Sequence, residues 1–159
     1  MFREMRRKQK KEITAEALEQ LLIRSRRGVL SVIGDDGYPY GVPVNYLFDP
    51  ENGRIYFHGA MAGHKADAIR NNDKVCFTVY GNEQIKNEPW APYLQSAVIF
   101  GRCRLIESRE DTLAAVKMLA MKYFPSEELA DMEIESDGYR VGIYEIMIEH
   151  MTGKEIQER

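Results

Sequence analysis

The amino-acid sequence predicts a mainly β protein, a small antiparallel β-barrel with peripheral helices. Short runs rich in β-branched and aromatic residues are separated by Gly-, Asp- and Asn-rich turns, which are too short for the crossovers that parallel strands need. The spacing of amphipathic helices occurs only near the start, in the middle and in the later part of the chain. A closed barrel also removes the free strand edges that promote aggregation.

The first predicted element is a helix over residues 14–25. Thr14 is a favourable N-cap, and Leu18, Leu21 and Leu22 have the spacing of one helix face. Three strands follow, at residues 29–33, 40–48 and 54–58, with turn sequences at 34–37 and 49–53. The first two strands are therefore expected to form a hairpin, which the third extends into a meander.

The second half of the chain continues the mixture of strands and helices. The elements expected there are a short helix over residues 65–70, a strand over 75–80, a polar loop over 81–93, a strand over 95–106, a helix over 109–123 and a last strand over 141–148. Gly81, Asn82, Pro89 and Pro92 predict the loop, and Pro125 ends the longer helix.

Length and composition indicate one globular domain over residues 1–159, with 44% hydrophobic and 30% charged residues and a net charge of −3. No apolar run approaches the ~18 residues of a membrane-spanning helix, and no secretory signal follows the charged start. A cytoplasmic protein without a membrane contact is therefore expected. Cys76 and Cys103 lie in strand-like segments and are expected to be buried, reduced thiols.

Residues 1–12 form a basic N-terminal arm, because Arg or Lys occupies six of the first eleven positions. Such a run can bind nucleic acid or a membrane surface. Only Phe2 lies among these charges, however, and the rest of the chain is net acidic. We therefore expect an arm that is solvated or contacts a second subunit, and no nucleic-acid partner.

The densest group of polar and small residues lies between His58 and Lys65. His58 ends a predicted strand, residues 59–63 are Gly, Ala and Met, and His64 and Lys65 begin a predicted helix. A helix start offers unpaired N–H groups and a positive dipole end, so that together with Lys65 it suits a phosphate or another anion. A Gly/Ala hinge between strand and helix is the alternative interpretation.

Other chemistries have less support. The run from Gly59 to Lys65 is not an ATPase phosphate-binding loop, because the Gly-Lys pair and a following Ser or Thr are missing. The three histidines have no His-x-His spacing and no carboxylate cluster beside them, so no metal site is expected. No nucleophile elbow surrounds a serine or cysteine, so no hydrolase is indicated.

Taken together and in order, several motifs resemble the FMN-binding split barrels related to pyridoxamine 5′-phosphate oxidase, and among these most closely the nitroimidazole-resistance branch. The motifs are residues 41–46 (GVPVNY), 55–60 (IYFHGA), 63–69 (GHKADAI), 72–77 (NDKVCF), 93–101 (YLQSAVIFG) and 149–154 (EHMTGK). The resemblance covers nearly the whole chain from about residue 6.

The resemblance implies a six-stranded antiparallel split β-barrel that forms a homodimer and holds two FMN molecules at the subunit interface. The residues that it places at the cofactor are Pro43, Val44, Asn45, Tyr46, His58, Gly59, His64, Lys65 and Ser96. Residues 43–46 would meet the flavin ring through backbone groups, and His58 and Gly59 would line the ring and ribityl chain. His64 and Lys65 would bind the phosphate, and Ser96 would reach the cofactor of the partner subunit.

The resemblance also implies an activity. The C-terminal Trp and Arg residues of the oxidase have no counterpart in register here, so oxidation of vitamin B6 is not expected. The expected function is instead an FMN-dependent oxidoreductase that reduces a small aromatic or nitro compound, with His58 as a catalytic proton donor. His58 that only packs on the flavin is the alternative. A flavin-binding or redox-sensing module without turnover, and a relative that binds haem or deazaflavin, also stay open.

Overall fold

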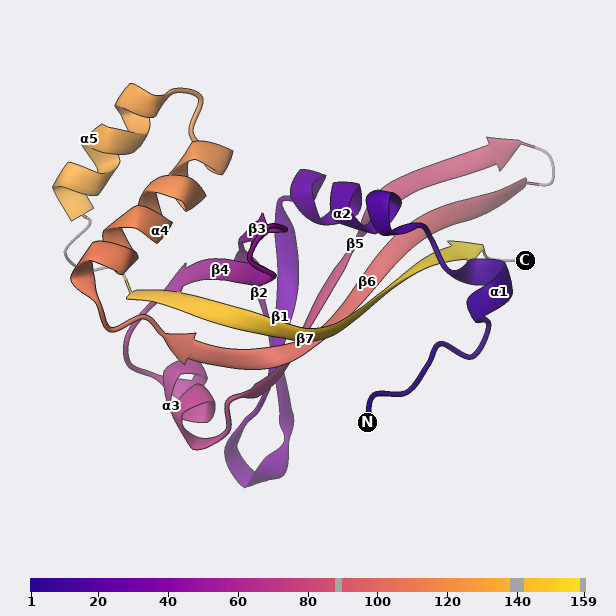
Figure 1. Cartoon of the computed structure of the whole chain (residues 1–159), viewed down its shortest axis with the longest axis horizontal. Coiled ribbons are helices and arrows are strands. Elements are labelled where there is room, and N and C mark those ends of the chain that lie inside the picture. The colour runs from indigo at the N-terminus through magenta and orange to yellow at the C-terminus, as the bar shows by residue number, and fades with distance from the viewer. Residues whose placement is uncertain (88–89, 138–141, 158–159) are drawn as a thin grey trace.

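The computed structural model describes residues 1–87, 90–137 and 142–157 of the chain (Figure 1). Its helices are α1 (Lys8–Lys11), α2 (Ala15–Arg24), α3 (His64–Asn71), α4 (Arg109–Tyr123) and α5 (Glu127–Asp137), with a short 3-10 turn η1 (Asp35–Gly37). Its strands are β1 (Arg27–Ile33), β2 (Pro39–Asn45), β3 (Leu47–Asp49), β4 (Arg54–Gly59), β5 (Lys74–Asn87), β6 (Trp90–Leu105) and β7 (Gly142–Gln157). The prediction of a mainly β fold with peripheral helices is confirmed.

The seven strands form one antiparallel sheet in the order β2-β1-β5-β6-β7-β4-β3. The two strands at the ends of this order, β2 and β3, are neighbours in the chain, since only Tyr46 separates them. The sheet therefore curls until its ends meet at Tyr46, whereas β2 and β4 do not pair and leave the barrel split. The predicted strand 40–48 is broken at Tyr46, which explains seven strands instead of six.

Helix α2 packs its apolar face into the core inside the curled sheet. Leu18, Leu21 and Leu22 are buried, as their spacing predicts. The Thr14 side chain accepts the N–H of Ala17 at 3.1 Å and so caps the first turn of the helix. The helix lies across the strands in Figure 1, between the curled sheet and the base of the long β5–β6 hairpin. It positions the start of β1, which contributes to the site described below.

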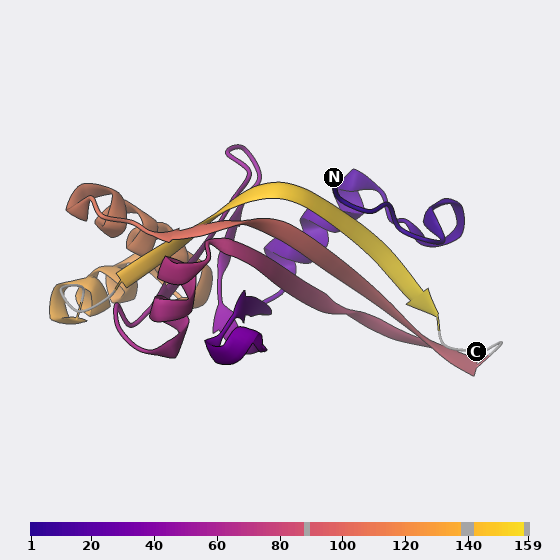
Figure 2. The ribbon, with the colours of Figure 1, turned by 90° about the horizontal axis from the view of Figure 1, so that it is seen from below.

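The polar loop predicted over residues 81–93 is wrong. β5 and β6 continue as a hairpin through most of this segment, where Ile85 pairs with Pro92. A register shift between Gly81 and Gln84 absorbs the irregular residues at its start. Cross-strand pairing here overrides the local turn signals of Gly, Asn and Pro. Figure 2 shows the resulting long strands arching away from the helical end of the molecule.

Three further elements differ from the prediction. β7 extends to Gln157, well beyond residue 148, because it pairs along its length with the long strand β6. Helix α5 was not predicted, since its sequence EELADMEIESD spreads acidic residues without a clear apolar stripe. The short helix α1 lies within the predicted arm. No described helix is both long and apolar enough to span a membrane.

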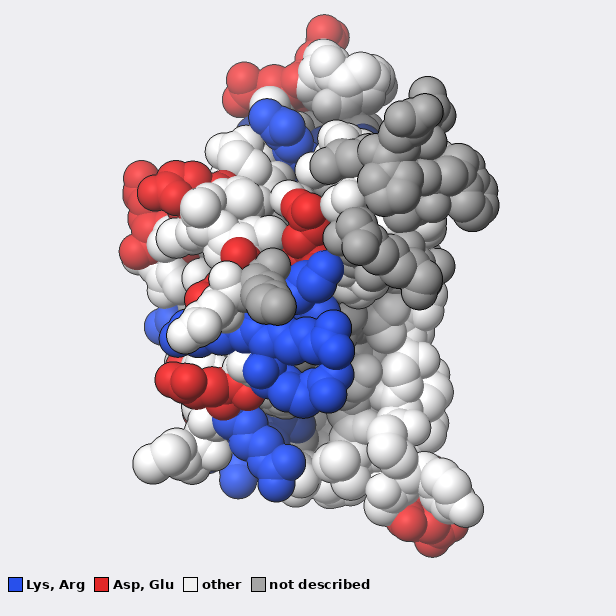
Figure 3. All heavy atoms as spheres, turned by 90° about the vertical axis from the view of Figure 1, so that its right-hand side faces the viewer, with Lys and Arg blue, Asp and Glu red and all other residues white. Residues whose placement is uncertain are grey.

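The basic arm folds back onto the sheet. The Phe2 ring stacks on His150, with 4.9 Å between centroids, and on Phe100, with 5.5 Å. A single bridge joins Glu12 to Lys154 of β7. Figure 3 faces the end of the molecule that carries α1, and Lys and Arg side chains gather in the middle of this face.

The two cysteines are free thiols. Cys103 is buried, as predicted, and burial raises its pKa to about 12. Cys76 is half-buried on β5, so the prediction of a buried thiol is only partly right there.

Candidate functional site

The split in the barrel forms a hollow between β2 and β4. β3 pairs with β4 in a register that places Leu47 opposite Tyr56, and the same register continued would place Asn45 opposite His58. In the described sheet, however, β2 has β1 as its only strand neighbour, so its other edge offers backbone groups to a ligand. This β2–β4 hollow has a volume of about 640 Å³ and is lined by Arg27, Pro43, Val44, Asn45, His58, Gly59, Ala60 and Lys65.

Six of the nine residues predicted at a cofactor line this hollow, namely Pro43, Val44, Asn45, His58, Gly59 and Lys65. Arg27 and Ala60 line it as well and were not predicted. Arg27 lies directly opposite Asn45 in the β1–β2 pairing. The predicted hairpin could have indicated Arg27, because a register centred on the turn at 34–37 places Arg27 opposite Asn45.

Lys65 places a positive charge at the hollow. Its Nζ lies over the rings of Phe57 and Tyr144, 5.5 and 5.8 Å from their centroids, and no carboxylate of the described residues forms an ion pair with it. Burial lowers the pKa of the Lys65 amine. A Cβ at Gly59 would lie 2.6 Å from Nζ, so glycine leaves room for it. Gly63, with φ 105°, gives α3 no capping side chain, and the first-turn N–H groups stay open beside Lys65.

His64 does not share this position with Lys65. Its Nε2 accepts the backbone N–H of Asp35 at 3.3 Å, and its ring stacks on Tyr40 with 4.2 Å between centroids. His64 therefore faces the turn between β1 and β2 and does not line the hollow. Adjacent residues of a helix point in directions about 100° apart, which explains why the predicted basic pair is separated.

Two further predicted residues also lie outside the hollow. Tyr46 is fully buried, and its hydroxyl donates to the Leu22 carbonyl at 2.6 Å. Ser96 lies in β6, opposite Tyr80 of β5 and Lys154 of β7. Tyr46 is thus a core residue at the joint between β2 and β3, and Ser96 is far along the sheet from β4.

Helix α4 holds the joint at Tyr46 in place. The Tyr123 hydroxyl accepts the Tyr46 N–H at 2.8 Å, and Lys122 Nζ donates to the carbonyls of Ser25 and Tyr46 at 2.6 and 3.0 Å. These bonds satisfy backbone groups that leave the strand ladder where the strand breaks. Burial lowers the pKa of Lys122 to about 8 and raises the pKa values of Tyr46 and Tyr123. Because Asn45 precedes Tyr46, α4 also fixes one wall of the hollow.

A smaller pocket opens on the far side of Asn45 and His58, between β4, β7 and the α4–α5 pair. Its volume is about 340 Å³, and it is lined by Asn45, His58, Val116, Leu119, Ala120, Tyr123, Phe124, Glu133, Ile134 and Ile143. Since Asn45 and His58 line both cavities, this helical pocket adjoins the β2–β4 hollow at these two side chains.

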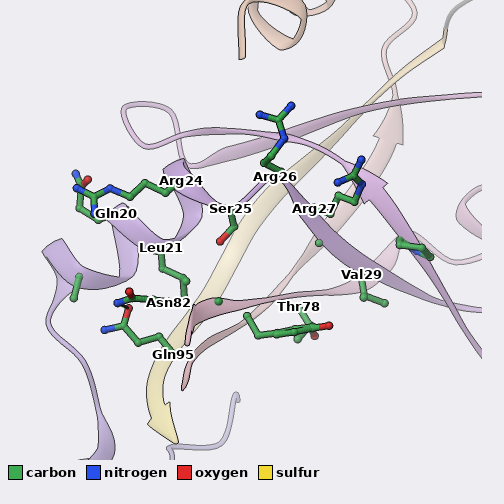
Figure 4. Close-up of a pocket in the computed structure, with 15 residues that line it drawn as sticks. Gln20, Leu21, Arg24, Ser25, Arg26, Arg27, Val29, Thr78, Asn82 and Gln95 are labelled. Atoms are coloured by element: carbon green, nitrogen blue, oxygen red, sulfur yellow. Dashed lines mark hydrogen bonds between the residues drawn. The ribbon is translucent and has the colours of Figure 1, made fainter. Parts of the chain in front are cut away.

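A larger groove of about 770 Å³ lies between α2, β1 and the β5–β6 hairpin (Figure 4). It meets the β2–β4 hollow at Arg27 and Pro43, which line both. Arg24 and Arg26 line the groove too, but the three guanidinium groups diverge: Arg24 extends toward Gln20, and the other two extend to the opposite side (Figure 4). They do not converge on one point of the groove (Figure 4).

The three histidines lie in three different places. His58 is exposed at the hollow, His64 faces the β1–β2 turn, and His150 lies under Phe2 with its Nε2 buried and without a hydrogen-bond partner among the described residues. In the parts of the chain that the structure describes, no group of three or more His, Cys, Asp and Glu side chains is arranged to hold a metal ion.

A family model described as pyridoxamine 5′-phosphate oxidase matches residues 14–155. The chain belongs to the pyridoxamine 5′-phosphate oxidase family. The resemblance to this family predicted from the motifs is thereby confirmed. A search of curated proteins finds no significant match.

Solved structures extend this result to the fold. A candidate 5-nitroimidazole antibiotic resistance protein from Bacteroides thetaiotaomicron superposes with a TM-score of 0.78 at 19% identity, over 92% of this chain and 87% of that one. A FAD-binding protein from Mesorhizobium loti gives 0.65 at 20% identity, over 91% and 96%. The flavocytochrome Anf3 from Azotobacter vinelandii gives 0.73 at 18% identity, over 95% and 71%. At these identities the likeness shows the fold alone, and the predicted split barrel is confirmed.

Proposed function

We propose that this member of the pyridoxamine 5′-phosphate oxidase family binds FMN in the β2–β4 hollow and reduces a small aromatic or nitro compound. The observation that carries the proposal is Lys65, a half-buried cation without a described counter-ion beside the open first turn of α3. Across the hollow from it runs the free edge of β2. A phosphate at one end and a flat, hydrogen-bonding ring at the other fit this arrangement.

The phosphate end is built for a dianion. Lys65 and the first-turn N–H groups of α3 supply positive charge, whereas Arg27, the second cation of the lining, lies opposite Asn45. Gly59 leaves space for the Lys65 amine, because a Cβ at position 59 would collide with Nζ. His64 is not part of the phosphate site that we propose, since its ring is held at the β1–β2 turn.

The ring end lies along residues 43–45 of β2. Their backbone groups on the free edge would hold the flavin ring, as the resemblance to the family predicts. The neighbouring flavoproteins of the same fold, the FAD-binding protein and the flavocytochrome, support a flavin as the cofactor class. Bound here, FMN would supply electrons to a substrate, a chemistry that amino-acid side chains lack.

His58 is the candidate proton donor. It lies at the end of β4, where the β2–β4 hollow and the helical pocket meet, and it lines both. A histidine exchanges protons near neutral pH and can therefore protonate a substrate that has gained electrons. Its position between the two cavities supports this role for His58 in addition to simple packing.

A homodimer is the expected partner arrangement, and the outer sheet face supports it. Cross-strand partners share one face of a sheet, so the pairing defines two rows across five strands. These rows are Pro43, Val29, Thr78, Val98 and Thr152, and Gly41, Ser31, Cys76, Phe100 and His150. All ten residues are uncharged or His, which is typical of a covered surface, and Phe2 of the same chain covers two of them, Phe100 and His150. Ser96 shares this face through Tyr80, so it would point toward a partner subunit.

The cofactor is tested on the purified protein by its absorption spectrum and by identifying what heat releases. We expect a two-banded flavin spectrum and FMN at about one per chain. Released FAD would keep the flavin site but correct the cofactor, and a sharp Soret band would indicate haem. A colourless protein that takes up no added FMN would refute the proposal.

The phosphate contact is tested with Lys65→Met. Loss of a charge-assisted hydrogen bond costs about 1.5–3 kcal/mol, so FMN affinity should fall by roughly 10–150-fold. Lys74→Met, at an exposed lysine outside the hollow, is the matched control and should bind FMN like the wild type. Equal affinities for the two variants would remove Lys65 from the site. If neither reduced nicotinamides nor chemical reductants support turnover by the flavin-loaded protein, the protein is a flavin-binding module without turnover.

A further inference from the structure

The helical pocket is apolar on almost all sides. Six of its lining residues have apolar side chains, namely Val116, Leu119, Ala120, Phe124, Ile134 and Ile143. Its volume of about 340 Å³ is roughly twice the ~150 Å³ of a cavity that binds benzene, so a substituted single-ring compound fits in it. Ligand pockets are typically apolar cavities with a few polar groups, and this one lies at the small end of their range.

The pocket exists because α5 folds back against α4. Lys117 of α4 forms ion pairs with Glu127, at 3.2 Å, and with Asp131, both on α5. α5 thereby brings Ile134 and Glu133 over the apolar face of α4 and closes one side of the cavity. In Figure 1 these two helices stand beside the end of β4 and β7, away from the long hairpin.

The polar groups of the pocket are few and lie at two places. Asn45 and His58 lie where the pocket meets the β2–β4 hollow, and Glu133 contributes from α5. Glu133 is the only Asp, Glu, Lys or Arg among the described lining residues. Apart from His58 when it is protonated, an anionic ligand would therefore meet a like charge at Glu133 and no cation to offset its desolvation. A neutral ring with a polar substituent directed at Asn45 and His58 has no such penalty.

We infer that the helical pocket is the substrate subsite, that it takes a neutral single-ring aromatic compound, and that Glu133 excludes carboxylates from it. The inference rests on the proposed function, because a flavin in the β2–β4 hollow would lie next to this occupant. It adds that specificity resides in the α4–α5 pair, which is not part of the sheet that forms the hollow.

The test measures binding by calorimetry with two nearly isosteric probes, 4-nitrobenzyl alcohol and 4-nitrobenzoate. The wild-type protein should bind the alcohol at least about ten-fold more tightly than the carboxylate. Glu133→Lys should remove or reverse this preference. Glu135→Lys changes the same charge on the same helix, at an exposed position outside the pocket, and should keep it. Equal affinity of the wild type for both probes, or equal effects of the two substitutions, would overturn the inference.

A second variant tests the location of the site. Ala120→Leu places a larger side chain into the pocket and should weaken the alcohol at least about ten-fold, without changing FMN affinity. Thermal denaturation shows whether the Ala120→Leu variant is folded. If it is not, the location of the site is tested with Glu133→Lys alone. Unchanged affinity of the folded variant for the alcohol would place the probe outside the pocket and refute the assignment.

The two proposals fail separately. Each titration is run on the protein as purified and again with FMN added. Binding of the alcohol with the predicted preference, in a protein that takes up no flavin, would leave the subsite standing and refute the proposed function. Flavin binding without any binding of the alcohol would refute the subsite alone.

Discussion

Removing the Tyr123 hydroxyl tests whether helix α4 holds the split barrel together. In Tyr123→Phe the Tyr46 N–H loses its acceptor at 2.8 Å, and the hydroxyl can no longer donate to the Arg26 carbonyl at 2.5 Å or the Tyr46 carbonyl at 2.8 Å. The Tyr46 carbonyl keeps the bond from Lys122 at 3.0 Å. An unpaired buried N–H costs about 1–3 kcal/mol and a lost hydrogen bond about 0.5–1.5 kcal/mol. The free energy of unfolding should therefore fall by about 2–4 kcal/mol.

Urea denaturation followed by circular dichroism measures this change. For a chain of 159 residues, each kcal/mol lowers the melting temperature by about 2–4 °C, so a fall of about 5–15 °C is expected. Tyr38→Phe removes the hydroxyl of a tyrosine that is 74% exposed and should stay within about 0.5 kcal/mol of the wild type. If Tyr123→Phe also stays within that margin, the joint at Tyr46 does not depend on α4.

Three further outcomes are expected. Burial lowers the pKa of Lys122 from 10.5 to about 8, so on raising the pH the native state loses this proton before the unfolded state does. The free energy of unfolding of the wild type, relative to that of Lys122→Met, should therefore rise by about 1–2 kcal/mol from about pH 8 to pH 10. A difference in urea stability that stays flat over this range contradicts the assigned pKa. Gly101→Ala would push a Cβ into the backbone carbonyl of Met147 and should lower the stability by about 1–3 kcal/mol in thermal denaturation. Gly41→Ala, where the nearest atom to the new Cβ lies at 3.5 Å, should lower it only slightly. Equal melting temperatures of the two variants would be inconsistent with the contact. His58→Ala should slow reduction of a nitro compound at least about ten-fold and leave FMN bound, and unchanged turnover would remove His58 from the mechanism.

Local patterns were sufficient for most of the fold. The leucine spacing in residues 14–25 and the cap at Thr14 match helix α2, because both features act within one helix turn or two. The long β5–β6 hairpin could not be found in this way. Its pairing between Ile85 and Pro92 depends on a register set by strand residues farther down the sheet, and this non-local constraint outweighs the turn propensities of the segment.

The candidate site shows the same division. Lys65 lines the β2–β4 hollow, and its place after a small-residue loop at a helix start predicts an anion contact from local sequence, with a hinge as the alternative. His64 does not line the hollow, since the rotation between adjacent helix residues turns it toward Asp35 and Tyr40, and only the fold decides which of the two faces the hollow. The apolar spacing of Val116, Leu119, Ala120 and Tyr123 predicts the α4 side of the helical pocket, whereas the α5 side has no such signal, because the α5 sequence lacks a clear apolar stripe.

The break at Tyr46 is the step that converts a barrel into a binding site, and the local sequence conceals it. Val44, Tyr46 and Phe48 are buried in alternation, so the period of two that predicts a continuous strand runs straight through the joint. At the break, the hydroxyl of Tyr123, 77 residues away, accepts the Tyr46 N–H. β2 and β4 then lack mutual hydrogen bonds, and Asn45 and His58 face a hollow instead of each other. Through the Tyr123 hydroxyl and the Lys122 amine at Tyr46, helix α4 therefore fixes one wall of the cavity proposed to hold the cofactor.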